Sequence, residues 1–202
     1  MSLNDEDEVR TRRRGAALED ALLDAAWVEL TERGYENFTI DAVATRAGTS
    51  RAVLYRRWPS KPELVRAAIS HVVAQDPLEV TDTGSLRGDV IALLRQANER
   101  RVRVATQLVV SLADYYRATG TSLADLRESI SAGQGPIMDG VITRALERGE
   151  IDASRLTPRI RNLPVDLFRH EVLTTHSAVP EETILEIVDR IFLPLVGAAA
   201  QS

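Results

Sequence analysis

Apolar residues recur along most of the chain with the spacing of a helix, and the N-terminal third shows this clearly. Five apolar positions fall on one helix face: Leu22, Leu23, Ala26, Trp27 and Leu30. We expect a helix over residues 16–33, with Gly34 as its C-terminal stop. Alternating strand patterns and hairpin dipeptides are missing from the sequence, and this predicts an all-α fold.

Two short helices joined by a tight turn are predicted next. Thr39 stands where it can cap a helix that begins at Ile40 and ends near Gly48. A further helix follows the turn and ends at Trp58, with Pro59 after it. Two short helices about a glycine turn are typical of a helix-turn-helix, whose second helix enters the major groove of DNA.

The side chains of the second helix suit contact with DNA. Val53 and Leu54 are expected to pack inward, which leaves Arg51, Tyr55 and Arg57 for bases or phosphates. Arginine can bond guanine through two nitrogens, and tyrosine hydroxyls contact phosphate. This pattern alone does not exclude a helix hairpin that has no role in DNA binding, because such helix pairs are common in helical folds.

The chain divides into three predicted parts. A flexible N-terminal arm covers residues 1–15, a helix-turn-helix domain covers 16–75, and a helical regulatory and dimerisation domain covers 76–202. Pro77 and Gly84 mark the joint before the third part. Its helices are expected over residues 86–100, 104–118, 122–148, 158–175 and 181–199, the third of them kinked near residues 133–136.

Charge is unevenly distributed, although the net charge is only −5. Residues 1–9 carry −4, residues 10–75 carry +3 and residues 76–202 carry −4. A basic segment joined to an acidic body suits a DNA-binding domain attached to a regulatory domain, although an excess of three charges decides nothing alone.

Composition narrows the chemistry further. The chain has no cysteine, which excludes disulfides and thiolate metal sites, and we expect neither a metal nor a cofactor. No apolar run approaches the ~20 residues needed to cross a bilayer. The acidic residues 1–8 lack the features of a secretory signal. We therefore expect a cytoplasmic protein with no membrane partner.

Residues 16–75 resemble the opening of the TetR family of transcriptional regulators. Six segments carry the resemblance: residues 22–26 (LLDAA), 32–35 (ERGY), 38–44 (FTIDAVA), 47–50 (AGTS), 54–58 (LYRRW) and 60–64 (SKPEL). Trp58 replaces the phenylalanine that is commoner in the family, and Pro62 is a variant. The resemblance implies an N-terminal three-helix helix-turn-helix DNA-binding domain and a C-terminal helical ligand-binding and dimerisation domain.

The resemblance also implies which residues contact double-stranded operator DNA. Thr39 corresponds to a phosphate or groove contact at a helix N-terminus, and Lys61 corresponds to a phosphate contact at the start of the next helix. Lys61 is the only lysine of the chain. The full set is Thr39, Thr49, Ser50, Arg51, Ala52, Tyr55, Arg57 and Lys61, in which residues 49–52 face the groove and Tyr55 and Arg57 face the backbone.

The C-terminal segments are expected to make a homodimer, as in the family. Their apolar faces suit a four-helix bundle across a two-fold axis, and the alternative is that they close a monomeric core. The predicted interface residues are Leu167, Phe168, Ile184, Val188, Ile191 and Leu195.

A pocket for a small molecule is expected among the middle helices. The candidates are adaptable or amphipathic side chains: His71, Gln107, Tyr115, Tyr116 and Met138. Aromatic residues are few there and aliphatic residues are many, which indicates a partly apolar ligand without identifying it.

These features predict a ligand-responsive transcriptional regulator, a repressor that binds palindromic operator DNA as a dimer and is released by a small molecule. An enzyme is rejected. His170 and His176 are six residues apart, whereas zinc-binding helices pair histidines at i and i+4, and no phosphate loop or nucleophile elbow is visible. The remaining alternative is a helical protein-interaction module that does not bind DNA.

Overall fold

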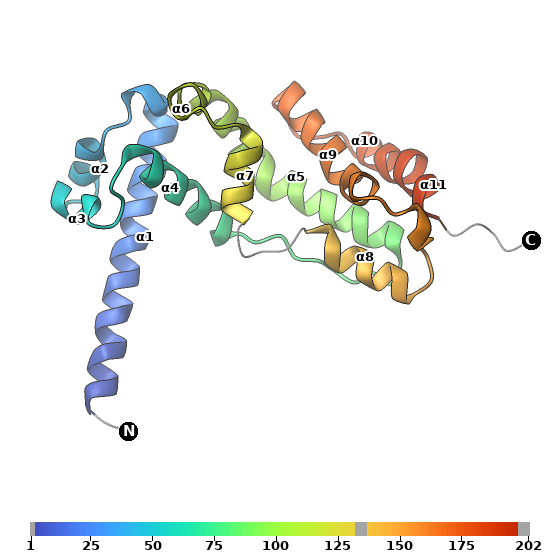
Figure 1. Ribbon diagram of the computed structural model, residues 1–202, viewed down its shortest axis with the longest axis horizontal. Coiled ribbons are helices and arrows are strands. Elements are labelled where there is room, and N and C mark those ends of the chain that lie inside the picture. The colour runs from blue at the N-terminus through green and yellow to red at the C-terminus, as the bar shows by residue number, and fades with distance from the viewer. Residues whose placement is uncertain (1–2, 132–136, 198–202) are drawn as a thin grey trace, which may run out of the picture. The chain divides into compact units, whose positions relative to one another are not determined.

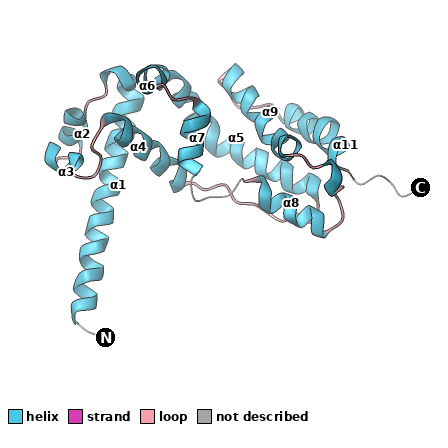
Figure 2. Ribbon diagram, viewed as in Figure 1, coloured by secondary structure: helices cyan, strands magenta, loops and turns pink. Residues whose placement is uncertain are grey.

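The computed structural model describes residues 3–131 and 137–197, and all regular elements within them are helices (Figures 1 and 2). The single β-type pairing in these ranges is an isolated bridge between Ile151 and Gly197. The all-α fold predicted from the sequence is confirmed. Contacts divide the chain into two compact units, Met1–Asp76 with Val110–Ile130 and Pro77–Val109 with Ser131–Ser202. Residues 110–130 therefore group with the N-terminal helices, although we expected them in the regulatory part.

The first unit contains α1 (Leu3–Asn37), α2 (Ile40–Arg46), α3 (Arg51–Tyr55), α4 (Lys61–Gln75), α6 (Ala113–Thr119) and nearly all of α7 (Leu123–Ser131). Helix α1 packs against α2, α4 and α6. The side chains that hold these helices together have no exposed surface: Leu22, Leu30, Leu54, Leu64 and Ile69. This core fixes the two short helices α2 and α3 relative to α1 and α4.

Helix α1 is longer than expected at both ends. It begins at Leu3, where we predicted an arm as far as Gly15. Glutamate and arginine are good helix formers, and acidic residues are favoured near a helix N-terminus, so the charged segment before Gly15 is compatible with a helix. At the other end Gly34 has φ 70° and interrupts the helix, and one further turn continues to Asn37. Glycine adopts this positive φ without strain.

The second unit contains most of α5 (Leu86–Ser111), then α8 (Met138–Glu147), the 3₁₀ turn η1 (Ala153–Arg155) and α9 (Pro158–Thr175). It ends with α10 (Glu181–Glu186), the π-helical segment η2 (Ile187–Phe192) and α11 (Leu193–Val196). Helix α5 is continuous where two helices were predicted, and the break comes at Leu112. The kink predicted near residues 133–136 lies outside the described residues.

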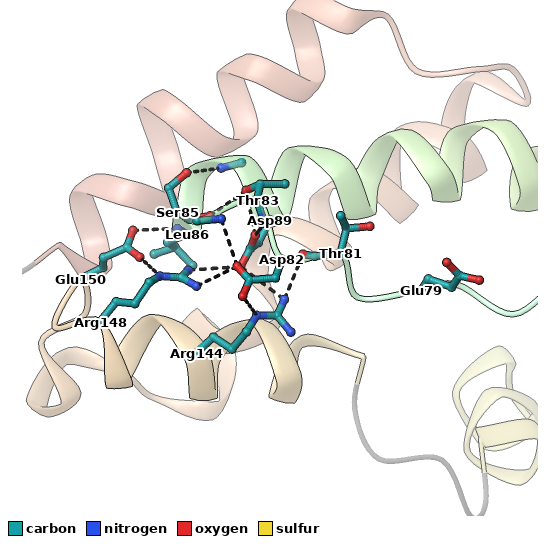
Figure 3. Close-up of polar contacts among 12 residues, drawn as sticks. Glu79, Thr81, Asp82, Thr83, Ser85, Leu86, Asp89, Arg144, Arg148 and Glu150 are labelled. Carbon is teal, nitrogen blue, oxygen red and sulfur yellow. Dashed lines mark hydrogen bonds and ion pairs between the residues drawn. The ribbon is translucent and has the colours of Figure 1, made fainter.

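A network of charged side chains fixes the start of α5 in the second unit (Figure 3). Asp89 is 1% exposed, and its carboxylate accepts hydrogen bonds from the amide and hydroxyl of Thr83 at 2.7 and 2.8 Å. Arg144 of α8 and Arg148, which follows that helix, donate to its other oxygen at 3.3 and 3.1 Å. Glu150 accepts the amide of Leu86 at 2.7 Å and so caps α5.

The segment that precedes α5 is bonded to the same unit along its length. Arg100 donates to the Pro77 carbonyl at 2.9 Å, and Gln96 exchanges hydrogen bonds with the backbone of Glu79 at 3.0 and 3.1 Å. Arg144 donates to the Thr81 carbonyl at 3.0 Å. The stretch predicted as a joint between domains is therefore anchored to α5 and α8.

Candidate nucleic-acid interface

Helices α2 and α3 form a helix-turn-helix in the first unit. The Thr39 hydroxyl caps α2 by accepting the Ala42 amide at 3.1 Å, as its position before Ile40 predicted. The turn that follows contains Gly48 with φ 62°, and the Thr49 amide donates to the Ala44 carbonyl at 2.9 Å. This turn brings Thr49 and Ser50 to the start of α3, where Ser50 is the N-cap residue.

Helix α3 has one buried side and one exposed side. Leu54 is fully buried and anchors the helix to the core of the unit. Arg51, Ala52 and Tyr55 are exposed. Tyr55 is 50% exposed, more than any other large hydrophobic side chain in the described residues. A short helix that presents a cation and a tyrosine to solvent has the form of a recognition helix.

Arg51 forms an ion pair with Asp41 of α2 across the turn. Its Nε lies 3.0 Å from the Asp41 carboxylate, and the two side chains are 65% and 63% exposed. Exposed ion pairs contribute little stability because water screens both charges. Arg51 is therefore held near the turn but remains free to leave Asp41 for a stronger acceptor such as a phosphate or guanine.

Arg57 is less accessible than Arg51. It is half-buried, and its Nη1 is buried without a hydrogen-bond partner among the described residues. Together with Trp58, Glu63 and Arg66 it lines a cavity of about 320 Å³ between the end of α3 and the outer face of α4. Arg57 is therefore less accessible than Arg51 and Tyr55, and its contact with the DNA backbone stays a prediction.

Lys61 lies at the first position of α4, and its ammonium already has partners in the protein. The Nζ donates to the Glu36 carbonyl at 3.2 Å and lies 4.3 Å from the centre of the Tyr35 ring. Burial lowers the pKa of Lys61, while the nearby Glu36 carboxylate acts in the opposite direction. An ammonium has three donors, and the Glu36 carbonyl uses only one of them.

The sequence analysis did not identify Glu29 and Arg46 as parts of this region. Glu29 is 2% exposed, and its carboxylate lies 2.8 Å from Nε of Arg46 on α2 and 2.9 Å from Nε of Arg33. Glu32 contacts the same Arg46 from one turn further along α1. The sequence did contain one signal for this ion pair, because Glu29 stands next to the apolar face of α1. A carboxylate that is buried there is nearly always paired with a cation.

The predicted dimer residues separate into two groups. Phe168, Ile184 and Val188 are 6%, 1% and 0% exposed and belong to the core of the second unit, and their contact with a partner stays a prediction. They are covered by their own chain. Ile191 and Leu195 are 37% and 41% exposed, one helical turn apart, and Leu167 is half-buried.

The predicted ligand residues are divided between the two units. His71, Tyr115 and Tyr116 belong to the first unit, whereas Gln107 and Met138 belong to the second. Met138 is fully buried in the core, and Gln107 is exposed. The His71 ring contacts Asp24 at 3.0 Å. A second cavity, of about 530 Å³, is lined by residues of α10 and η2 and by none of these five.

Clusters of metal-ligating side chains and membrane-spanning helices were sought in residues 3–131 and 137–197. No cluster of three or more histidine, aspartate or glutamate side chains there is placed to hold a metal ion. None of the helices in residues 3–131 and 137–197 is both long and apolar enough to cross a membrane.

Known proteins share both halves of this chain. Residues 22–68 match the family described as bacterial regulatory proteins, tetR family, and residues 80–191 match the tetracyclin repressor-like C-terminal domain. A DNA-binding transcriptional repressor TetR of Mycobacteroides abscessus is 30% identical over 189 residues, which are 93% of this chain and 98% of that protein. The regulator AqdR of Rhodococcus erythropolis is 29% identical over 150 residues, 72% of this chain and 69% of that protein.

Solved structures show the same fold. The fatty acid degradation regulator FadR of Bacillus halodurans has a TM-score of 0.62 at 16% identity and covers 86% of this chain and 97% of its own. The flavonoid-responsive regulator FrrA has a TM-score of 0.61 at 21% identity and covers 92% of this chain and 100% of its own. Proteins of this class are DNA-binding regulators and not enzymes, as the sequence predicted. The chain belongs to the TetR family of transcriptional regulators.

Proposed function

We propose that this protein is a repressor that binds a pseudo-palindromic operator as a homodimer and is released by a small molecule. The observation that carries the proposal is the exposed side of α3, where Arg51, Ala52 and Tyr55 face solvent while Leu54 anchors the helix. Thr39, Thr49 and Ser50 lie at the N-terminal ends of α2 and α3, where backbone amides favour phosphate.

A dimer is supported by the exposed pair Ile191 and Leu195. Two apolar side chains one turn apart near the C-terminal end of a helix suit packing against a second copy. A dimer presents two recognition helices, so its DNA site contains two half-sites related by two-fold symmetry.

Ligand response is the third part of the proposal. The structural neighbour FrrA is described as flavonoid-responsive, so the fold supports sensing of a small molecule. The candidates remain His71, Gln107, Tyr115, Tyr116 and Met138. A ligand releases DNA only if it binds the DNA-incompetent state more tightly than the competent state.

The proposal is tested with DNA from the region upstream of the protein's own coding sequence. Fluorescence anisotropy of labelled duplexes should identify a segment bound at nanomolar concentration, with affinity that falls steeply as salt rises because phosphate contacts release counterions. Arg51→Ala should weaken binding and relax the preference for one base pair per half-site, at a cost of about 1–3 kcal/mol.

Arg155→Ala is the matched control. Arg155 is also a partly exposed arginine, 47% exposed and paired with Asp152, but it lies in the second unit and should leave operator affinity unchanged. If wild-type protein bound no duplex in a salt-dependent manner, the alternative of an interaction module without DNA binding would replace the proposal.

A further inference from the structure

Lys61 is joined to α6 by a chain of three tyrosines within the first unit. The Tyr35 ring lies between the Lys61 ammonium, 4.3 Å from the ring centre, and the Tyr115 ring, whose centre is 5.2 Å away at 86°. Tyr116 continues the chain, with its ring centre 5.7 Å from that of Tyr115 at 77°. Edge-to-face geometry at these distances is favourable between aromatic rings.

The middle members of the chain are buried, so water does not compete for their contacts. Tyr35 is 6% exposed and Tyr115 is 4% exposed. Burial raises the pKa of Tyr35, with a smaller contribution from Tyr115, so the Tyr35 ring remains neutral at physiological pH. In a close-packed interior a displaced ring also displaces its neighbour.

The end of α1 holds the Lys61 ammonium at two points. The Glu36 carbonyl accepts one N–H at 3.2 Å, and carbonyls in the last turn of a helix carry partial negative charge. The Tyr35 face attracts the same cation. A lysine side chain has many rotamers in solution, so these contacts restrict where the remaining N–H donors of Lys61 point.

We propose that Tyr35 and Tyr115 are positioning residues for operator binding. They hold Lys61 at the start of α4 in the orientation that meets a DNA phosphate, and they make that orientation depend on α6. This inference rests on the proposed operator binding. It gives Tyr115 a role in transmitting the position of α6 to the DNA-contacting lysine, in addition to the ligand contact predicted from the sequence.

The test is a double-mutant cycle on operator affinity with the full-length protein. Lys61→Met should weaken binding about tenfold and lower the slope of log affinity against log salt by about one. Tyr115→Leu should weaken binding several-fold in the wild-type background and have no effect in the Lys61→Met background, because its effect passes through Lys61. Tyr115→Phe keeps the ring and should retain wild-type affinity.

A control separates positioning from a general loss of stability. Leu126 on α7 is 3% exposed in the same unit, and Leu126→Ala should change affinity by the same factor with and without Lys61→Met. If Tyr115→Leu behaved like Leu126→Ala, or changed nothing, the positioning role would be wrong. If Lys61→Met left affinity and salt slope unchanged, the inference would be overturned while operator binding through Arg51 stood. If the wild-type protein did not bind operator DNA at all, the proposed function itself would be contradicted.

Discussion

Glu29, buried on α1, holds Arg46 of α2 through a contact of 2.8 Å between the carboxylate and Nε. Helix α2 has only seven residues and is too short to be stable alone. Its position therefore depends on its contacts with α1. Val43 and Ala44 of α2 are buried, and Glu29 adds a charged contact to this apolar packing. Because α2 carries α3 through a four-residue turn, this contact also orients the predicted recognition helix.

We expect Glu29→Gln to lower the free energy of unfolding by about 1–2 kcal/mol, because a buried charge-assisted hydrogen bond to Arg46 is weakened. Operator affinity should fall as well, since α2 is held less firmly. Urea unfolding at neutral pH measures the first effect, and anisotropy measures the second.

Glu32→Gln is the matched control for this change. Glu32 contacts the same Arg46, but its side chain is 54% exposed, so its removal should change stability by less than about 0.5 kcal/mol. Equal effects of the two substitutions would mean that the burial of Glu29 is irrelevant.

Asp41→Asn should increase operator affinity several-fold. The Asp41 carboxylate holds Arg51 in the free protein at 3.0 Å, and it places a negative charge beside the predicted DNA-binding face. Removing the charge frees Arg51 and reduces repulsion of phosphates. The measurement is the association rate and affinity for the operator duplex at low and high salt. The gain should shrink at high salt, and a loss of affinity would show that Asp41 instead orients Arg51 for DNA.

Short-range sequence patterns, such as capping residues, predicted the helices of the candidate interface better than they predicted the contacts between those helices. Thr39 caps α2 with its hydroxyl, as its place before Ile40 predicted. Helix α9 has the predicted bounds, Pro158–Thr175. Such features depend on a few neighbouring residues, so a single sequence contains the necessary information.

Contacts between distant segments were not predictable in the same way. Lys61 binds Glu36, 25 residues earlier, and no spacing rule relates the two. The apolar period of the last helices marks which side chains are buried, but not whether their own chain or a partner covers them. Ile184 and Val188 therefore had the same pattern as Ile191, although only Ile191 is exposed.

Asp89 should give the stability of the second unit a distinctive dependence on pH. Burial alone raises the pKa of its carboxyl group, but the hydrogen bonds from Thr83, Arg148 and Arg144 outweigh burial and hold that pKa below its ordinary value. A carboxyl whose pKa is lowered by folding stabilises the folded state above its unfolded pKa of about 3.9. That contribution is lost as the pH falls through the lower folded value.

Asp89→Asn should therefore destabilise the protein by about 2 kcal/mol near pH 7. The difference from wild type should shrink as the pH is lowered below about 4. Asp82→Asn serves as the control, because Asp82 contacts the same Arg148 but is 58% exposed, and it should cost much less at pH 7. Denaturant unfolding between pH 3 and pH 7 tests this. A difference between wild type and Asp89→Asn that grew on acidification would contradict the assignment.

The exposed pair Ile191 and Leu195 should determine the oligomeric state. Light scattering of the wild type at micromolar concentration should give about twice the 22.3 kDa of one chain. Replacing both residues with glutamate places two like charges on each facing surface and should yield a monomer. Because a monomer holds only one half-site at a time, tight operator binding should be lost together with the dimer. Leu146→Glu is the control, since Leu146 on α8 is 39% exposed and should leave the dimer intact. If the double variant stayed dimeric with unchanged operator affinity, the interface would have to lie on another surface of the chain.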